Sequence, residues 1–284
     1  MNESAPKQFL LLGGYGLAGR QVAELLLRST DNVRLTLAGR NLTRAEALAQ
    51  DLNARFDGDR VLAACVDASN PHNLQSAFCA VDMVLVLSST SKYTEQVAEA
   101  ALQANIDYYD ILDSPENLTA LQKLDHKIRD SGHYFITGGG FRPGLPATMI
   151  RRAASKFDEL KTAMVGSIVR IDWKSLELSD STWEEFGGKF VIENLDNFHY
   201  EDMFTSGGTE MDFGDQVGRQ EVTHVSLEEL QHLPDLIPTL QQVGFYIGTL
   251  SNWFVDLVLP LSLFPFMLLL LAMFPNRGQL QIGK

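Results

Sequence analysis

The chain has 284 residues, enough for two domains at about 150 residues each. Acidic residues outnumber basic ones by 36 to 23, and the formal net charge of -13 excludes a protein that neutralises phosphates over a broad nucleic-acid surface. Hydrophobic residues make up 45% and charged residues 21%, a balance that excludes a disordered or collagen-like chain. The charges are unevenly spread, because from Leu236 onward the only charged residues are Asp256, Arg277 and Lys284.

The first 140 residues alternate short apolar runs with longer segments of helical spacing, which predicts βαβ units and a doubly wound parallel sheet. We expect strands at 8–12, 33–38, 61–66, 83–87, 108–111 and 134–136. We expect helices at 18–28, 43–56, 71–80, 94–104 and 115–130. Two helix starts carry signals, since Thr43 with Glu46 has capping-box spacing and Ser114 precedes a proline.

The alternation stops after a glycine- and proline-rich turn near residue 140. A helix is predicted at 146–157 and a strand at 167–173, and a less regular stretch follows. We therefore expect an α/β domain over residues 1–140 and a second, α+β domain over 141–284 that serves substrate binding and dimerisation.

Cys65 and Cys79 are the two cysteines of the chain, and their spacing is neither a disulfide framework nor a metal-ligand pattern. We expect both to be small core residues. The first residues lack the charged start and the apolar run of a secretory signal. A reducing, cytoplasmic setting is therefore expected.

A glycine-rich segment lies directly after the first strand and before the first helix. Gly14, Gly16 and Gly19 have G-x-G-x-x-G spacing, and Gly13 allows a second frame, Gly13-x-x-Gly16-x-x-Gly19. Such glycines permit a tight turn, close approach of a pyrophosphate and close helix packing, and the helix N-terminus binds phosphate. A dinucleotide site is predicted from Gly13, Gly14, Tyr15, Gly16, Leu17, Ala18 and Gly19. The alternative is a tight turn without a ligand.

The second strand ends at Arg40 and Asn41, where an NAD-selective site has Asp or Glu. Arg40 offers a planar, permanently charged donor for a 2'-phosphate, and the missing carboxylate removes a repulsion. We therefore expect NADP(H) to be preferred over NAD(H), with Arg40 and Asn41 binding the cofactor. The alternative is a solvated loop arginine.

Polar residues also follow the third and fourth strands. Asp67 follows the third, and Ser88, Ser89 and Thr90 follow the fourth. Ligands of open α/β sheets lie outside the carboxyl ends of the strands, so we expect Asp67 near the adenine end of the cofactor and Ser88 and Ser89 near the ribose or nicotinamide. Helix capping is the competing role for the three hydroxyl residues.

These motifs resemble those of the saccharopine dehydrogenase (saccharopine reductase-like) family. The resembling segments are Gly13–Arg20, Ala38–Asn41, Tyr108–Asp110 and Gly139–Leu145. The resemblance implies a Rossmann NADP-binding domain, a mixed α/β substrate domain, frequent dimerisation, and reduction of an imine formed from an amino acid and a carbonyl compound. The second half of the chain contains no family motif that identifies the substrate.

Hydride transfer needs a group near the nicotinamide that moves a proton. Candidates at strand ends or at the domain junction are Tyr93, Tyr109, Asp110, Asp113 and Arg142. Arg142 either holds a substrate carboxylate through two hydrogen bonds or fixes the turn between the domains. His199 and His224 are further candidates, because imidazole titrates near neutral pH. No metal site is expected, since the histidines are scattered.

The segment 257–274 has 15 apolar residues in 18, interrupted by Pro260, Ser262 and Pro265. Its length reaches that of a membrane span, but two prolines five residues apart kink or split a helix. Three alternatives stay open: a helix at a subunit interface, a kinked membrane-inserting segment, or a core helix covered by residues beyond this chain. The chain itself is either a short family member or a fragment.

We therefore expect a cytoplasmic NADP(H)-dependent oxidoreductase of saccharopine dehydrogenase-like type, acting on an amino-acid-derived C-N or carbonyl substrate bound near Ser88–Tyr93 and Arg142. Its expected partners are the small-molecule substrate, a second copy in a homodimer, and a membrane or lipid surface through 257–274. The alternative is a non-catalytic dinucleotide-binding sensor or membrane-associated scaffold. The absence of a recognised proton-transfer pair, such as the Tyr-x-x-x-Lys pair of short-chain dehydrogenases, favours that alternative, whereas the complete cofactor loop favours the enzyme.

Overall fold

The structure is a computed structural model that describes residues 5–112, 114–169 and 209–250. These residues form two compact units. The first unit contains residues 5–163 and 227–243, and the second contains 164–169, 209–226 and 244–250. The predicted domain boundary at residue 140 stays a prediction.

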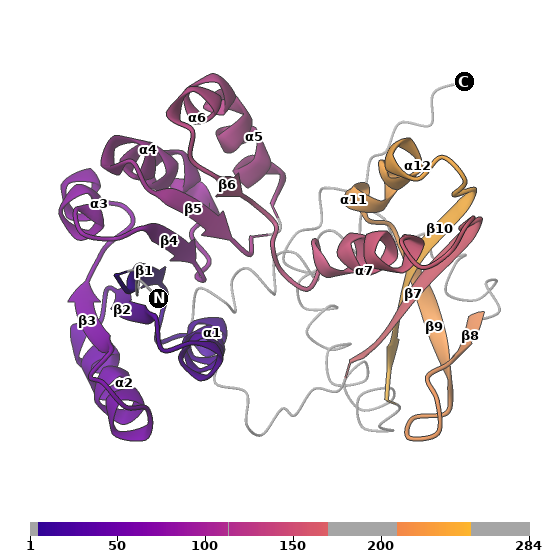
Figure 1. The fold of residues 1–284 in the computed structure, drawn as a ribbon, viewed down its shortest axis with the longest axis horizontal. Helices are drawn as coiled ribbons and strands as arrows, with labels where there is room; N and C mark the ends of the chain where they lie inside the picture. Colours follow the sequence, from indigo (N-terminus) through magenta and orange to yellow (C-terminus); the bar gives the residue numbers. More distant parts are fainter. Residues whose placement is uncertain (1–4, 113, 170–208, 251–284) are drawn as a thin grey trace, which may run out of the picture. The chain divides into compact units, whose positions relative to one another are not determined.

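A six-stranded parallel sheet forms the centre of the first unit (Figure 1). Its strands are β1 (Lys7–Leu12), β2 (Val33–Gly39), β3 (Val61–Cys65), β4 (Met83–Val86), β5 (Asp107–Asp110) and β6 (Phe135–Ile136). Their order is β3-β2-β1-β4-β5-β6, and each neighbouring pair is parallel. This arrangement confirms the predicted doubly wound fold. The strand order reverses between β1 and β4, which is where such sheets bind their ligands.

Helices connect the strands of this sheet. They are α1 (Leu17–Ser29), α2 (Leu42–Arg55), α3 (Pro71–Phe78), α4 (Thr94–Ala104), α5 (Pro115–Lys123) and α6 (Asp125–Ser131), with a short 3-10 helix, η1 (Ser91–Tyr93), before α4. The cap predicted at Ser114 is confirmed, since its Oγ accepts from the amide of Asn117. The capping box at Thr43 and Glu46 is wrong, because Asn41 caps α2 by accepting from Arg44 N at 3.0 Å. The single helix predicted at 115–130 is two helices that meet at Leu124.

Two apolar clusters cover the two faces of the sheet, because alternate strand residues point to opposite sides. Leu10 and Leu12 of β1 join one cluster, which α3, α4 and α5 cover. Leu11, between them, joins the other cluster, which α1 and α2 cover. The cysteine prediction is wrong: Cys65 and Cys79 are both exposed, at the end of an edge strand and at the C-cap of α3.

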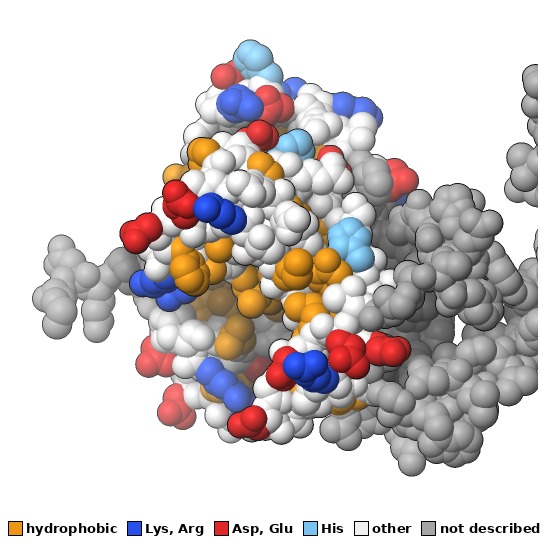
Figure 2. Space-filling model, turned by 90° about the vertical axis from the view of Figure 1, so that its right-hand side faces the viewer, with side chains coloured by type: hydrophobic (Ala, Val, Ile, Leu, Met, Phe, Trp, Pro, Cys, Tyr) orange, Lys and Arg blue, Asp and Glu red, His pale blue; other side chains and the backbone are white. Residues whose placement is uncertain are grey.

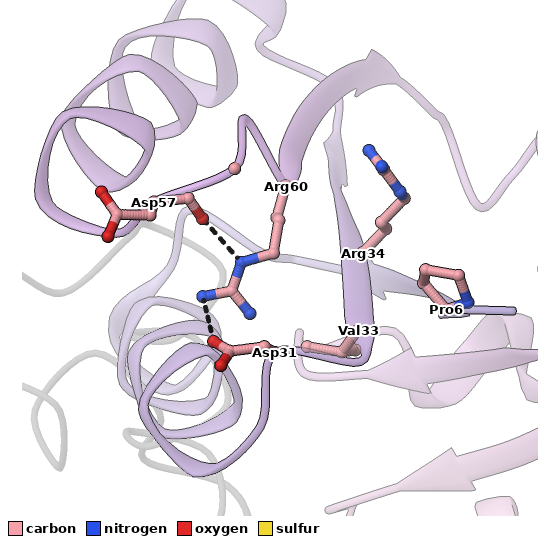
Figure 3. Close-up of a pocket in the computed structure, with 7 residues that line it drawn as sticks. Pro6, Asp31, Val33, Arg34, Asp57 and Arg60 are labelled. Atoms are coloured by element: carbon pink, nitrogen blue, oxygen red, sulfur yellow. Dashed lines mark hydrogen bonds and ion pairs between the residues drawn. The ribbon is translucent and has the colours of Figure 1, made fainter. Parts of the chain in front are cut away.

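A buried arginine ties helix ends together at the amino-terminal edge of the sheet (Figure 3). Arg60 is 8% exposed, and its guanidinium donates to the carbonyl oxygens of Asp57 at 2.9 Å, Thr30 at 2.7 Å and Leu27 at 3.2 Å. These last two carbonyls belong to the C-terminal end of α1, where a positive charge is favourable. Arg60, Arg34 and Asp31 line a pocket of about 370 Å³ at this edge.

A second, four-stranded sheet has the order β7-β10-β9-β8. Its strands are β7 (Thr162–Val169), β8 (Thr209–Asp212), β9 (Arg219–Val225) and β10 (Gln242–Thr249). Three more helices lie in the described part of the first unit: α7 (Leu145–Ala154), α11 (Glu228–Gln231) and α12 (Leu233–Leu236). The strand predicted at 167–173 begins five residues earlier, and residues 170–173 lie outside the described residues. β8 and β10 both pair antiparallel with β9.

Polar and apolar side chains are segregated on part of the surface. On the face drawn in Figure 2, hydrophobic side chains gather at the centre and charged side chains surround them. None of the helices in the described ranges is long and apolar enough to cross a membrane. The apolar segment 257–274 lies outside those ranges, so its three alternatives stay open.

Candidate dinucleotide-binding site

The glycine-rich loop after β1 forms the tight turn that the spacing predicts, and a Cβ at either Gly13 or Gly14 would come within 3.0 Å of neighbouring atoms. Gly13 has φ of +89°, and a Cβ there would lie 2.6 Å from the Cβ of Ser88. Gly13 N donates to Ala38 O at 2.8 Å, and Gly16 N donates back to Gly13 O at 2.9 Å. Gly19 packs on the backbone of Gly13 and Gly14 so closely that a Cβ would overlap them.

Gly16 leaves its side of the loop open. A Cβ at Gly16 would meet one atom, Gly13 O at 3.2 Å. Gly16 is also the N-cap of α1, and neither a capping side chain nor an acidic residue occupies the first turn. The amides of Leu17, Ala18 and Gly19 are the first three of the helix and so lack intrahelical acceptors. A helix start with these features fits a pyrophosphate.

Tyr15 connects this loop to the end of β2. Its hydroxyl accepts from Asn41 N at 3.0 Å, and its ring covers Gly39, where a Cβ would lie 2.5 Å from Tyr15 Cε1. The guanidinium of Arg44 lies over the same ring, 5.5 Å from its centroid. Arg44 was not among the predicted site residues, although its position four residues after Arg40 in the first turn of α2 was a usable signal.

Arg40 and Asp67 follow neighbouring strands and interact electrostatically. Arg40 is exposed. Hydrogen bonds from the Ser69 amide and hydroxyl, at 2.9 and 2.8 Å, lower the pKa of Asp67, and the positive charge of Arg40 lowers it further. Asn41 lies at the predicted position after β2, and its side chain also caps α2. The structure therefore brings Gly13–Gly19, Arg40, Asn41 and Asp67 to one edge of the sheet, where the strands have their carboxyl ends.

Ser88 lies on the other side of the switch point, directly beside Gly13. The competing capping role is wrong for the residues after β4. Thr90 and Tyr93 are the N-caps of η1 and α4, and neither side chain makes a capping hydrogen bond. The Thr90 hydroxyl instead donates to Ser88 O at 3.2 Å. Ser88 and Ser89 remain predicted contacts of the cofactor.

Asp110 is a fully buried hub at the end of β5. Its carboxylate accepts from Tyr108 Oη, Leu112 N, Asn117 Nδ2, Thr137 Oγ1 and Gly138 N at 2.7 to 3.1 Å. Burial and the neighbouring Asp110 charge raise the pKa of Tyr108 well above its ordinary value. Asp110 therefore holds the segments after β5 and β6 together, which is a structural role that the sequence did not predict.

The segment 138–144 follows β6 and carries Arg142. Gly139 N donates to Asp110 O at 2.9 Å, and the Tyr109 hydroxyl donates to Gly139 O. At the other end Gly144 N donates to Glu229 Oε2 at 2.7 Å. Glu229 comes from α11, 85 residues further along the chain, and no sequence signal pointed to it.

The remaining candidates are dispersed. Asp113 and His199 lie outside the described residues, and His224 is exposed on β9, where its ring contacts Tyr246 edge to face. Among the residues that the structure describes, no group of three His, Cys, Asp or Glu side chains is arranged to hold a metal ion.

The strand order, the glycine turn at the switch point and the open start of α1 define a Rossmann dinucleotide-binding domain. Residues 9–136 match the family model described as the saccharopine dehydrogenase NADP binding domain. This match supports a preference for NADP, in agreement with the preference predicted from Arg40.

Two comparisons extend beyond the family model. A Mycobacterium tuberculosis protein named as a trans-acting enoyl reductase is 29% identical over 142 residues, which are 49% of this chain and 33% of that protein. The apo saccharopine dehydrogenase (L-Glu forming) of Saccharomyces cerevisiae has a similar fold, with a TM-score of 0.55 and 17% identity over 86% of this chain and 54% of that one. The chain thus spans about a third of the length of the curated relative and about half of the yeast enzyme.

Proposed function

We propose that the chain is an NADP(H)-dependent oxidoreductase that acts on an amino-acid-derived C-N or carbonyl substrate. The observation that carries the proposal is the open glycine turn at the switch point, where Gly16 leaves space beside the uncapped start of α1. The match of residues 9–136 to the saccharopine dehydrogenase NADP binding domain supports NADP as the cofactor. The enoyl reductase and the saccharopine dehydrogenase named above support reduction chemistry in general.

Each part of the proposed site binds a different part of the cofactor. NADPH, when bound, supplies a hydride. The loop from Gly13 to Gly19 binds the pyrophosphate, while Arg40, Asn41 and Arg44 bind the 2'-phosphate and Asp67 lies toward the adenine. Ser88 lies against Gly13 and is therefore beside the loop that binds the pyrophosphate. From this position Ser88 and Ser89 orient the ribose or nicotinamide. These assignments follow the position of each residue at the carboxyl edge of the sheet.

Two further residues act on the substrate. Arg142 is exposed, and no ion pair joins it to another described residue, so its guanidinium is available to a substrate carboxylate. Tyr93, in η1 after β4, supplies the proton to the reduced atom. Asp110 acts at a distance, since it is buried and holds the 138–144 segment in place.

A screen of L-amino acids paired with 2-oxo acids for NADPH consumption tests the proposal. Gly16→Val places a side chain in the open space of the loop, so we expect turnover and NADPH binding to be lost while circular dichroism stays unchanged. Arg34→Gln, at the opposite edge of the sheet, is the matched control and keeps both. Turnover by Gly16→Val at the wild-type rate would overturn the assignment of the loop to pyrophosphate binding.

The non-catalytic alternative has one observation in its favour. Asp110, one of the predicted catalytic candidates, is fully buried and accepts five hydrogen bonds that maintain the fold. NADPH binding without turnover on any pair in the screen would favour a dinucleotide-binding sensor over the enzyme.

A further inference from the structure

The side chain of Tyr15 contacts both the end of β2 and the start of α2 from within the glycine-rich loop. Its hydroxyl accepts from the amide of Asn41, the N-cap of α2, at 3.0 Å. Its ring lies so close to Gly39, the last residue of β2, that a Cβ there would be 2.5 Å from Tyr15 Cε1. The ring is half-buried and packs against the apolar cluster that α1 and α2 cover. These contacts fix the orientation of the Tyr15 ring.

The guanidinium of Arg44 lies over this fixed ring, with Cζ 5.5 Å from the ring centroid. The backbone of Arg44 is held as well, because its amide donates to Asn41 Oδ1 at 3.0 Å. The ring attracts the positive charge, although such a contact is modest where the side chain is exposed. Together the two contacts restrict a long side chain that would otherwise sample many rotamers.

The position of Arg44 is electrostatically unfavourable unless an anion is present. It lies in the first turn of α2, at the positive end of the helix dipole, and no acidic residue occupies this turn. No carboxylate in the described part of the chain pairs with its guanidinium within 4.0 Å. Arg40, which directly precedes the N-cap, adds a second positive charge, and both arginines are exposed. An anion from solution can therefore reach the Arg44 guanidinium, and a phosphate fits its planar donors.

We propose that Tyr15 is a positioning residue that strengthens the preference for NADP(H) by holding the Arg44 guanidinium ready for the 2'-phosphate. This inference rests on the proposed function, and it gives the Tyr15 side chain a role separate from pyrophosphate binding by the loop backbone. A guanidinium that is ordered before the cofactor arrives loses less conformational freedom on binding. Because NADH lacks the 2'-phosphate, the ring raises the affinity for NADPH and leaves that for NADH unchanged.

Fluorescence titration of the full chain with NADPH and with NADH tests this role. Tyr15→Leu removes the ring, so we expect the ratio of NADPH affinity to NADH affinity to fall by about three- to tenfold, the usual effect of ordering one long side chain. Tyr15→Phe keeps the ring and should retain the ratio. The two cofactors differ only in the 2'-phosphate, so general damage to the loop weakens both and leaves their ratio unchanged. Tyr15→Met, which also lacks the ring, replaces Tyr15→Leu if circular dichroism shows that variant to be unfolded.

A double-mutant cycle shows whether Tyr15 acts through Arg44. Arg44→Gln should lower the ratio at least as much as Tyr15→Leu does, and adding Tyr15→Leu to Arg44→Gln should lower it no further. The matched control is Arg55→Gln at the opposite end of the same helix. The Arg55 guanidinium also lies over an aromatic ring, 5.6 Å from the centroid of Phe56, and its replacement should retain the ratio.

The inference is overturned if either Tyr15→Leu or Arg44→Gln retains the wild-type ratio. Equal weakening of NADPH and NADH by Tyr15→Leu also overturns it, because that result indicates a purely structural role. A loss in Tyr15→Phe as large as in Tyr15→Leu assigns the effect to the hydroxyl and contradicts the role of the ring. A wild type that binds neither cofactor contradicts the proposed function itself, whereas a preference for NADPH that survives removal of the ring contradicts only the role of Tyr15.

Discussion

Replacing Asp110 by Asn is expected to destabilise the first unit strongly. All five groups that contact this carboxylate are donors, three at Oδ1 and two at Oδ2. An asparagine keeps one oxygen for the three donors at Oδ1, and its NH2 group then faces Tyr108 Oη and Asn117 Nδ2. Two hydrogen bonds to a buried charge are lost, each worth about 1.5 kcal/mol or more, so the expected loss is about 3 kcal/mol.

Urea unfolding followed by circular dichroism measures this loss. The matched control is Asp107→Asn on the same strand, because Asp107 is partly exposed and accepts from His133 Nδ1 and Tyr134 N at 3.2 and 3.0 Å. We expect the control to lose less than about 1 kcal/mol, as is usual for pairs near the surface. A loss for Asp110→Asn as small as that of the control would show that the five donors do not require a carboxylate.

Three further predictions concern the loop, the arginine at the opposite edge and pH. Gly13→Ala should lower stability by about 1–3 kcal/mol more than Gly132→Ala, because both residues have positive φ but a Cβ at Gly132 meets no atom within 4 Å; equal unfolding midpoints would contradict this. Arg60→Lys should lose about 1–3 kcal/mol in urea unfolding, since an ammonium cannot reach all three carbonyls; an unchanged midpoint would contradict it. Because the pKa of Asp67 is lowered in the folded state, its contribution to stability is present above its ordinary value of 3.8 and is lost as pH falls through the lowered pKa. Asp67→Asn should therefore flatten the fall of stability between pH 5 and about 2, and parallel curves would be evidence against it.

The sheet could be predicted from the sequence because its signals are local. Each strand is a short apolar run between helical segments, so all six strands and the bounds of α4 agree with the prediction. Errors arose where two local signals compete. Asn41 and Thr43 are both capping residues, and the structure uses Asn41, whose backbone is also held by Tyr15. Cys65 lies in an apolar strand, but this strand is at the edge of the sheet, so the residue is exposed.

The site was predictable only in part, for a similar reason. The glycine spacing indicated the turn, but it did not indicate that Ser88, which follows β4, approaches Gly13 closely. Asp110 was singled out because it follows a strand, whereas its five partners come from four separate segments. The contact between Gly144 and Glu229 joins residues 85 apart, and neither residue type indicates the other.

Preference for NADPH over NADH is measured by a fluorescence titration of the full chain with both cofactors, repeated on Arg40→Ser. We expect the wild type to bind NADPH more tightly than NADH, by roughly 10- to 100-fold, because hydrogen bonds from a guanidinium to a phosphate are worth about 1.5–3 kcal/mol. In Arg40→Ser the difference should fall to the part that Arg44 maintains, while NADH binding stays the same. Equal or tighter binding of NADH by the wild type would contradict the assignment of Arg40 to the 2'-phosphate of NADP.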